Sequence, residues 1–221
     1  MNKKKIAGEA VTQFIKDGMI VGLGTGTTAY YAIQAIGELV KEGVSIQAVA
    51  TSKTTELQAI ELGIPLLNID DVTYIDLAID GVDEIDFEFN AIKGGGGALF
   101  REKVVASLAN EVIWIMDDSK LVDSLGKFPL PVEVARFGHK QVYQKMESFG
   151  MNPEIRKRND EYFITDNGNY IIDLHLGMGF QVNEVLTKLS HMVGIFEHGL
   201  FCNFCNSIII GCNSGAKIID I

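Results

Sequence analysis

The sequence predicts an α/β protein with a parallel sheet and a smaller α+β part. Short apolar segments alternate with helical patterns through the first half of the chain, as in parallel sheets covered on both faces. The pattern breaks at Pro129 and Pro131, and shorter strand and helix patterns follow. Apolar strand patterns return at the end of the chain, so the last segment is expected to rejoin the first sheet.

The first half is expected to hold the main sheet. Ile75, Leu77 and Ile79 alternate along one face of a strand, and the apolar residues of the first helix recur every three to four positions. The predicted strands cover residues 19–23, 46–50, 74–80 and 112–116, and the predicted helices cover residues 29–40, 54–62 and 98–110.

The second half is expected to form the α+β part. Asp-Asn-Gly-Asn at 166–169 is typical of a hairpin turn between strands over 162–165 and 170–174. A further strand is predicted over 154–157, with helices over 139–149 and 182–189, and the final strands over 207–211 and 217–220. We therefore expect a larger domain from residues 1–127 plus about 205–221, and a smaller domain from about 128–204.

Composition excludes several classes of function. The chain has 221 residues and a formal charge of −10, so it can bury a core but repels nucleic acid and anionic membranes. No apolar run approaches the ~18 residues of a membrane span, and no export signal is expected. The three cysteines, at 202, 205 and 212, are too few and too close for a disulfide framework, which favours a cytoplasmic location.

A glycine-rich segment follows the first predicted strand. Gly22-Leu-Gly-Thr-Gly-Thr-Thr-Ala29 offers backbone N–H groups, hydroxyls and a helix N-terminus, which together suit an anion such as a phosphate. Gly24, Gly26 and Ala29 also fit a dinucleotide fingerprint, but the second strand ends in Thr51-Ser-Lys53 rather than in the acidic residue that binds a ribose. A nicotinamide site and an ordinary tight turn are the alternatives.

Two further motifs follow the third predicted strand. Asp80-Gly-Val-Asp83 places two carboxylates beyond a strand end, where they suit acid–base chemistry or sugar binding; a solvated acidic loop or a divalent-ion site are the alternatives. Lys93 precedes four glycines, a costly run to order unless the backbone must approach a ligand closely. Its ammonium group could stabilise an oxyanion.

Glu102 lies on a stripe of small apolar residues in the helix that follows the glycines. Ala98, Glu102, Val105 and Ala109 share one helical face, so the carboxylate is expected to be partly dehydrated, which favours a general base. A solvated Glu within Arg-Glu-Lys is the alternative. Lys120 follows the strand over 112–116 and is expected on the same rim of the sheet as the earlier motifs. Cys202 and Cys205 and the scattered histidines are expected to be structural.

Taken together, the motifs resemble the type A ribose-5-phosphate isomerase family. The resemblance rests on Gly-Thr-Gly-Thr-Thr (24–28), Asp-Gly-Val-Asp (80–83), Lys-Gly-Gly-Gly (93–96), Arg-Glu-Lys (101–103), Asp-Ser-Lys (118–120) and Gly-Lys-Phe-Pro-Leu-Pro-Val-Glu (126–133). These occur in order over nearly the whole chain, whereas the segment 197–206 is less typical of the family.

The resemblance implies a Rossmann-like domain with a smaller ferredoxin-like domain, in a homodimer or homotetramer that needs no metal or cofactor. It implies an aldose–ketose isomerase that interconverts ribose 5-phosphate and ribulose 5-phosphate in the pentose phosphate pathway. Glu102 would be the general base, and Asp80, Asp83 and Lys93 the remaining catalytic groups. The implied substrate-binding residues are Thr25, Gly26, Thr27, Thr28, Gly81, Val82, Gly94, Gly95, Gly96 and Lys120, with Lys4 as a further phosphate contact.

Two other functions share this architecture. A non-catalytic sugar-phosphate sensor would use the same cleft, but the roughly 18 residues before the first strand are too few for the DNA-binding helices that such sensors carry. A coenzyme A transferase would use a nucleophilic Glu, but the chain is short for one.

Overall fold

The computed structural model describes residues 2–221, and the chain divides into two compact units. The first unit comprises Met1–Val82, Arg101–Lys120 and Asn203–Ile221, and the second comprises Asp83–Phe100 and Leu121–Cys202. The sequence analysis instead expected residues 83–100 and 121–127 in the larger domain. The difference arises because short strands within 83–100 pair with a distant strand of the second unit, a contact that no local pattern reveals.

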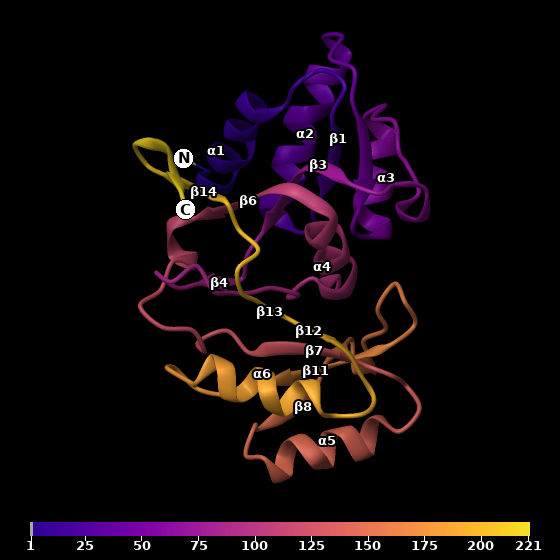
Figure 1. The fold of residues 1–221 in the computed structure, drawn as a ribbon, viewed down its shortest axis with the longest axis vertical. Coiled ribbons are helices and arrows are strands. Elements are labelled where there is room, and N and C mark those ends of the chain that lie inside the picture. The colour runs from indigo at the N-terminus through magenta and orange to yellow at the C-terminus, as the bar shows by residue number, and fades with distance from the viewer. Residues whose placement is uncertain (1) are drawn as a thin grey trace. The chain divides into compact units, whose positions relative to one another are not determined.

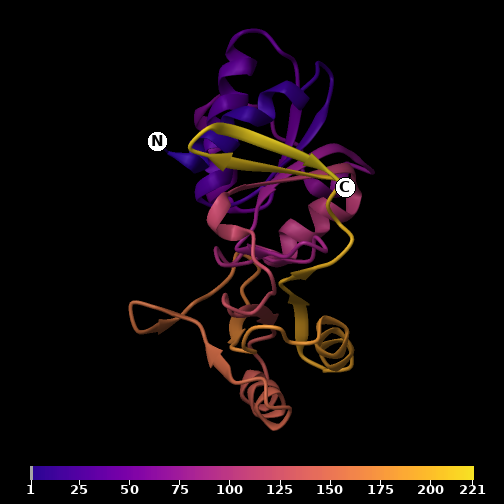
Figure 2. The ribbon, with the colours of Figure 1, turned by 90° about the vertical axis from the view of Figure 1, so that its left-hand side faces the viewer.

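The first unit is built on a six-stranded sheet in the order β15-β14-β6-β3-β1-β2 (Figure 1). The strands are β1 (Ile20–Leu23), β2 (Gln47–Ala50), β3 (Ile75–Gly81), β6 (Ala109–Asp117), β14 (Ser207–Cys212) and β15 (Gly215–Asp220). All pairs are parallel except the edge hairpin β14–β15, which Figure 2 shows clearly. The expected α/β class with a parallel sheet is thus confirmed, as is the return of the last segment to the main sheet.

Helices cover both faces of this sheet. On one face, Leu23 and Leu77 pack in a single apolar cluster with Ile33 and Ile36 of α2. On the other face, Val105 of α4 lies so close to Gly22 that any side chain there would overlap it. The helices are α1 (Lys3–Glu9), α2 (Thr27–Lys41), α3 (Lys53–Glu61) and α4 (Leu99–Leu108), with 3-10 turns η1 (Ala10–Phe14), η2 (Ile69–Asp71) and η3 (Asp118–Lys120).

The second unit contains a four-stranded antiparallel sheet in the order β12-β7-β11-β8. Its strands and helices are β7 (Leu130–Val134), α5 (His139–Ser148), β8 (Pro153–Ile155), β11 (Tyr170–Leu174), α6 (Val182–Ser190) and β12 (Ile195–His198). This β-α-β-β-α-β connectivity is the ferredoxin-like arrangement. Val132 and Ile172 point to the face on which Met146 of α5 and Leu189 of α6 pack.

Smaller strands complete the second unit. β9 (Lys157–Arg158) and β10 (Glu161–Tyr162) form a short hairpin, and β13 (Leu200–Phe201), β5 (Ala91–Ile92) and β4 (Glu84–Ile85) form a three-stranded sheet. Two-residue strands have no periodic pattern in the sequence, so none of β4, β5 and β13 was expected. None of the helices within residues 2–221 has the length and apolar character needed to cross a membrane.

The expectation that two prolines interrupt regular structure is wrong at Pro131. This residue lies within β7, between β11 and β12 in the sheet. A proline has no backbone N–H group. At position 131 such a group would point past the end of β12, because the pairing of β12 with β7 ends at His198. Only the carbonyl of Pro131 is used on this side, and it accepts a hydrogen bond of 2.7 Å from Gly199 N–H. A proline therefore costs no ladder hydrogen bond here.

One predicted helix is too long, and one helix of the structure was not predicted. The helix expected over 98–110 ends at Leu108, because Ala109 and Asn110 already belong to β6. Helix α1 was not expected, although Asn2 caps it by accepting a hydrogen bond from Lys5 N–H. The buried face of α1 is formed by the small residues Ala7 and Gly8, so the helix has almost no apolar stripe that could reveal it.

Candidate active site

The carboxyl ends of β1 and β3 define the candidate site in the first unit. β1 leads into α2 and then to β2 on one side, while β3 and β6 lie on the other side, so the strand order reverses between β1 and β3. Open α/β sheets bind ligands at such a switch point. The segment Gly24–Thr28 leaves β1 here, and Asp80 and Gly81 end β3.

Gly24 and Asp80 are in close backbone contact. A side chain on Gly24 would overlap the Asp80 carboxylate and lie 2.6 Å from Asp80 Cα. The carboxylate is buried, and its Oδ1 accepts hydrogen bonds from Thr25 N–H (3.0 Å) and Gly81 N–H (2.7 Å). A glycine is therefore required at position 24. It allows the loop after β1 and the end of β3 to donate hydrogen bonds to the same Asp80 carboxylate, and these hydrogen bonds fix the orientation of the carboxylate.

The Thr25 hydroxyl belongs to a buried network behind the loop. Its Oγ1 lies 2.8 Å from Thr51 Oγ1, 2.8 Å from Ser52 Oγ and 3.2 Å from Thr55 Oγ1. Thr55 Oγ1 donates in turn to Gly24 O at 2.8 Å. The sequence analysis missed Thr51, Ser52 and Thr55 as residues that support the loop; the only signal was their place directly after the second strand.

The other side of the loop is open. Gly26 is the N-cap of α2 with φ 120°, and among residues 2–221 no side-chain hydrogen bond caps the first turn of this helix. Thr27 is exposed and its Oγ1 accepts a hydrogen bond of 2.8 Å from Lys4 Nζ. A pocket of about 350 Å³, lined in part by Thr25, Gly26 and Thr27, adjoins the loop. Uncapped N–H groups beside a lysine suit an anionic ligand.

Lys120 lies at the end of β6, on the same rim of the sheet. Burial raises the pKa of Asp117, but hydrogen bonds from Ser119 and the charges of Lys120 and Lys4 outweigh burial and lower that pKa below its ordinary value. The two lysines therefore lie near the same carboxylate. This brings Lys4 and Lys120 to the rim that also holds the loop after β1.

Glu102 lies in the first turn of α4 and is buried, with 4% of its surface exposed. Of the residues expected to share its face, Ala98 and Val105 are buried as well, whereas Ala109 lies in β6 and not on the helix. The alternative of a solvated glutamate in a charged run is therefore wrong.

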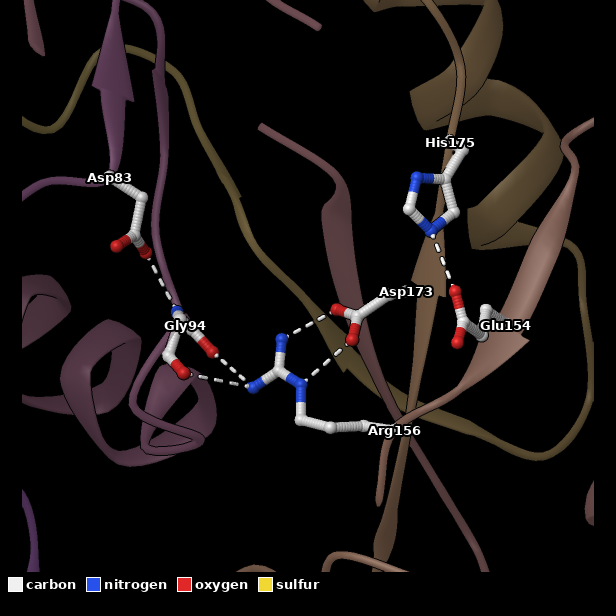
Figure 3. Close-up of polar contacts among 7 residues, drawn as sticks. Asp83, Gly94, Glu154, Arg156, Asp173 and His175 are labelled. Carbon is white, nitrogen blue, oxygen red and sulfur yellow. Dashed lines mark hydrogen bonds and ion pairs between the residues drawn. The ribbon is translucent and has the colours of Figure 1, made fainter. Parts of the chain in front are cut away.

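The second unit orders the glycine run through Asp83. Asp83 Oδ2 accepts a hydrogen bond of 2.7 Å from Gly95 N–H (Figure 3). A side chain on Gly95 would lie 2.6 Å from the Asp83 carboxylate, and Gly94 adopts φ 102°, a conformation that favours glycine. These two glycines are needed for the close approach of the loop to the carboxylate.

Lys93 is held by the junction of three strands. Its N–H donates to Gly199 O at 2.8 Å, and Gly199 N–H donates to Pro131 O at 2.7 Å. A side chain on Gly199 would overlap the Lys93 carbonyl. The Lys93 side chain is 2% exposed, and its Nζ lies 5.3 Å from the centre of the Phe201 ring, within reach of a cation–π interaction. The ammonium group is thus shielded from water.

The sequence-predicted residues therefore fall into two sets. The first unit contains Thr25, Gly26, Thr27, Thr28, Asp80, Gly81, Val82, Glu102, Lys120 and Lys4, and the second contains Asp83, Lys93, Gly94, Gly95 and Gly96. The chain passes from one unit to the other at 82–83, 100–101, 120–121 and 202–203. Within residues 2–221, no cluster of three His, Cys, Asp or Glu side chains is arranged to hold a metal ion.

Comparison with known proteins gives a consistent result. A family model described as ribose 5-phosphate isomerase A (phosphoriboisomerase A) matches residues 47–215. The chain is 51% identical over 217 residues to the ribose-5-phosphate isomerase A of Listeria monocytogenes, covering 95% of this chain and 94% of the relative. It is 48% identical over 220 residues to that of Streptococcus sanguinis, covering 99% and 98% respectively.

Solved structures agree with these sequence relatives. A D-ribose-5-phosphate isomerase in complex with phospho-erythronic acid matches with a TM-score of 0.94 and 38% identity, over 100% of both chains. The ribose 5-phosphate isomerase A of Methanocaldococcus jannaschii matches with a TM-score of 0.91 and 36% identity, over 99% of this chain and 98% of that one.

Proposed function

The chain belongs to the ribose 5-phosphate isomerase A family and is an isomerase of ribose 5-phosphate, and we propose how its residues divide the reaction. The reaction interconverts D-ribose 5-phosphate and D-ribulose 5-phosphate through an enediolate. The relatives are named as isomerases, so a non-catalytic sugar-phosphate sensor is not favoured. The observation that carries the proposal is the burial of Glu102 in the first turn of α4.

Glu102 is the general base. In the open-chain aldose, its carboxylate takes the proton from C2, the C1–C2 double bond forms, and the electron pair of the C1 carbonyl moves onto O1. The same carboxyl group returns the proton to C1, while the O2 hydroxyl proton passes to O1 and leaves a ketone at C2. A buried carboxylate keeps the proton from exchanging quickly with water, and general-base catalysis contributes roughly 10²–10⁴ in rate.

Lys93 and the glycine run stabilise the charge on the enediolate oxygen. The ammonium group of Lys93 is shielded from water, and the backbone of this residue is held by the Gly199 junction, so the group needs little reorganisation when the charge develops. Gly96 is exposed and contributes a backbone N–H group from the same loop, while Gly95 N–H is held by Asp83. A preorganised donor of this kind is worth about 3–4 kcal/mol.

Asp80 or Asp83 opens the sugar ring by moving a proton between the ring oxygen and the anomeric hydroxyl. The two can be told apart because ribulose 5-phosphate, whose O5 carries the phosphate, cannot close a furanose ring. The Asn variant of the ring-opening residue therefore loses turnover of ribose 5-phosphate but still exchanges the C1 proton of ribulose 5-phosphate in D₂O. The Asn variant of the other residue affects both reactions alike.

The phosphate is bound by the open side of the loop after β1. The uncapped first turn of α2, Thr27 and Lys4 supply donors there, and Lys120 adds a positive charge on the same rim. Holding the remote phosphate orients C1 and C2 against the base, which contributes to kcat as well as to binding.

The test of the proposal is Glu102→Gln, with Glu111→Gln on the exposed start of β6 as its matched control. We expect Glu102→Gln to lower kcat by at least about 10²-fold with a modest change in KM, and to abolish exchange of the C1 proton in D₂O. Near-parental turnover in Glu102→Gln would remove this residue as the base. Activity that survives treatment of the parent with a chelator supports a metal-free reaction.

We also propose a homodimer or homotetramer. Leu57 and Ile60 are 63% and 59% exposed and lie one turn apart on α3, and Tyr30 of α2 is 49% exposed, so the first unit presents apolar surface that a second copy could cover. Light scattering of the purified protein decides the mass in solution. A cytoplasmic location is proposed on the three free cysteines.

A further inference from the structure

An arginine that belongs to none of the sequence motifs donates hydrogen bonds to the carbonyl groups of the glycine run. Arg156 lies between β8 and β9 in the second unit, and its Nη1 donates to Gly94 O at 2.8 Å and to Gly95 O at 3.2 Å (Figure 3). Consecutive carbonyls of the loop thus share one guanidinium nitrogen.

The guanidinium group is itself fixed. Nε donates to Asp173 Oδ2 at 2.8 Å and Nη2 donates to Asp173 Oδ1 at 2.5 Å, and both side chains are only 14% exposed. Asp173 belongs to β11, which is paired on both sides, with β7 and with β8. Arg156 N–H adds a backbone hydrogen bond of 2.9 Å to Ile171 O in the same strand. A bidentate pair of this kind sets the plane and the position of the guanidinium.

The position of this arginine determines which way the loop amides point. In a trans peptide the C=O and the following N–H point in opposite directions. The peptide that joins Gly94 to Gly95 is therefore clamped at both ends, with its carbonyl on Arg156 and its N–H on Asp83. The next peptide has its carbonyl on Arg156 as well, so Gly96 N–H points away from the arginine. Gly96 is exposed, and its N–H has no hydrogen-bond partner within residues 2–221.

We infer that Arg156 is a positioning residue for the isomerase reaction. It orients the peptide planes of Gly94–Gly96, so that Gly95 N–H holds Asp83 and Gly96 N–H is available to the substrate oxyanion. Its positive charge beside the two carbonyls also polarises these peptides and strengthens their N–H groups as donors. The arginine acts through the loop and does not touch the substrate. This inference rests on the proposed function, because the oxyanion belongs to that reaction.

A purely structural role would predict different behaviour. If Arg156 served only to join β8 to β11, its loss would lower stability and leave kcat of the folded enzyme unchanged. As a positioning residue it affects kcat, because a misplacement of the reacting groups by about 1 Å can cost 10²-fold. Lysine at this position keeps the charge but cannot form the fork with Asp173 and reach two carbonyls.

The test compares Arg156→Lys with Arg158→Lys. Arg158 is exposed, its guanidinium lies 5.0 Å from the centre of the Phe163 ring, as that of Arg156 does at 5.9 Å, and its side chain makes no hydrogen bond within residues 2–221, so it is a matched control. We expect Arg156→Lys to lower kcat by about tenfold or more with KM changed less than about threefold, whereas Arg158→Lys stays at the parental rate. Equal kcat values for the parent and Arg156→Lys would overturn the inference.

Three further experiments keep the test decisive. In Arg156→Ala, added guanidinium ion should restore part of kcat and ammonium ion should not; failure of guanidinium in a folded variant counts against the inference. If Arg156→Ala does not fold, Asp173→Asn, which keeps the side-chain shape, should lower kcat in the same way as Arg156→Lys. Amide hydrogen exchange at Gly95 should speed up in Arg156→Lys, and this readout does not depend on activity. An inactive parent with slow Gly95 exchange would instead refute the proposed function.

Discussion

Substituting Gly24 by alanine should damage both folding and catalysis, because this residue leaves no room for a Cβ. The new methyl group would overlap the Asp80 carboxylate and lie 2.6 Å from Asp80 Cα. Gly24 is absent from the residues with positive φ, so an alanine meets no backbone strain and the whole effect is steric. The backbone of β3 cannot yield like a flexible side chain, so either the loop after β1 or the carboxylate must move.

The size of the effect follows from what is displaced. Overpacking a tight site costs about 1–3 kcal/mol. If the carboxylate swings away, it also loses the hydrogen bonds from Thr25 N–H and Gly81 N–H, and hydrogen bonds to charged groups are worth about 1.5–3 kcal/mol each. Because relaxation divides the strain between these two routes, so that part of each cost is incurred, we expect a total loss of about 2–4 kcal/mol. For a chain of this length that lowers Tm by roughly 4–16 °C.

The assay measures Tm by calorimetry and kcat/KM with ribose 5-phosphate. Gly24→Ala should lose at least about 10²-fold in kcat/KM, because Asp80 and the phosphate loop move together. The control is Gly63→Ala, where φ is 73° and nothing lies near the new methyl, so only the left-handed backbone is penalised, by about 1–2 kcal/mol, at parental activity. A Gly24→Ala variant with Tm within about 2 °C of the parent and unchanged kcat/KM would refute this reasoning.

Three other substitutions probe separate features. Glu133→Ala should lower the free energy of unfolding, measured in urea, by about 3 kcal/mol or more. The reason is that the buried Glu133 Oε1 accepts side-chain hydrogen bonds from Thr165 (2.8 Å), Asn167 (3.0 Å) and Asn169 (2.9 Å). The control Glu147→Ala, on the exposed side of α5, should change this free energy little. Ser119→Ala should destabilise the protein near neutral pH and not at low pH. The pKa of Asp117 is lower in the folded protein than in the unfolded chain. The ionised carboxylate therefore stabilises the fold at pH values above its unfolded pKa of about 3.9, and this stabilisation is lost as the pH falls through the folded pKa. A difference in urea midpoint between Ser119→Ala and the parent that does not change with pH would contradict this reasoning. Lys4→Met should lower kcat/KM for ribose 5-phosphate several-fold, with KM raised, and an unchanged kcat/KM would mean that Lys4 does not contact the phosphate.

The sequence predicts those features of the site that depend on residues close together in the chain. The strands that carry Leu23 and Asp80 are apolar runs with glycine-rich or acidic ends, and the candidate residues at those ends lie at one edge of the sheet because all parallel strands end there. The burial of Glu102 follows from the spacing of its apolar neighbours along α4.

Long-range pairing escapes prediction. Arg156 reaches carbonyls 61 and 62 residues away, and Thr25 contacts hydroxyls 26–30 residues away, so neither contact leaves a local pattern. Pro131 shows the opposite error, because a residue that breaks most strands is harmless where the neighbouring strand has already ended. Strand ends and loop supports depend on tertiary partners that spacing in the sequence does not encode.

The uncapped first turn of α2 has a consequence for the stability of the protein in the presence of its substrate. Because no side chain in the described part of the chain caps this turn, a bound phosphate ester would itself act as the cap. Any ligand that binds only the folded chain adds stability in proportion to the logarithm of its concentration, about 2.7 kcal/mol at a hundred times its Kd. The durability of the enzyme against heat and proteases would then rise and fall with the supply of its own metabolites.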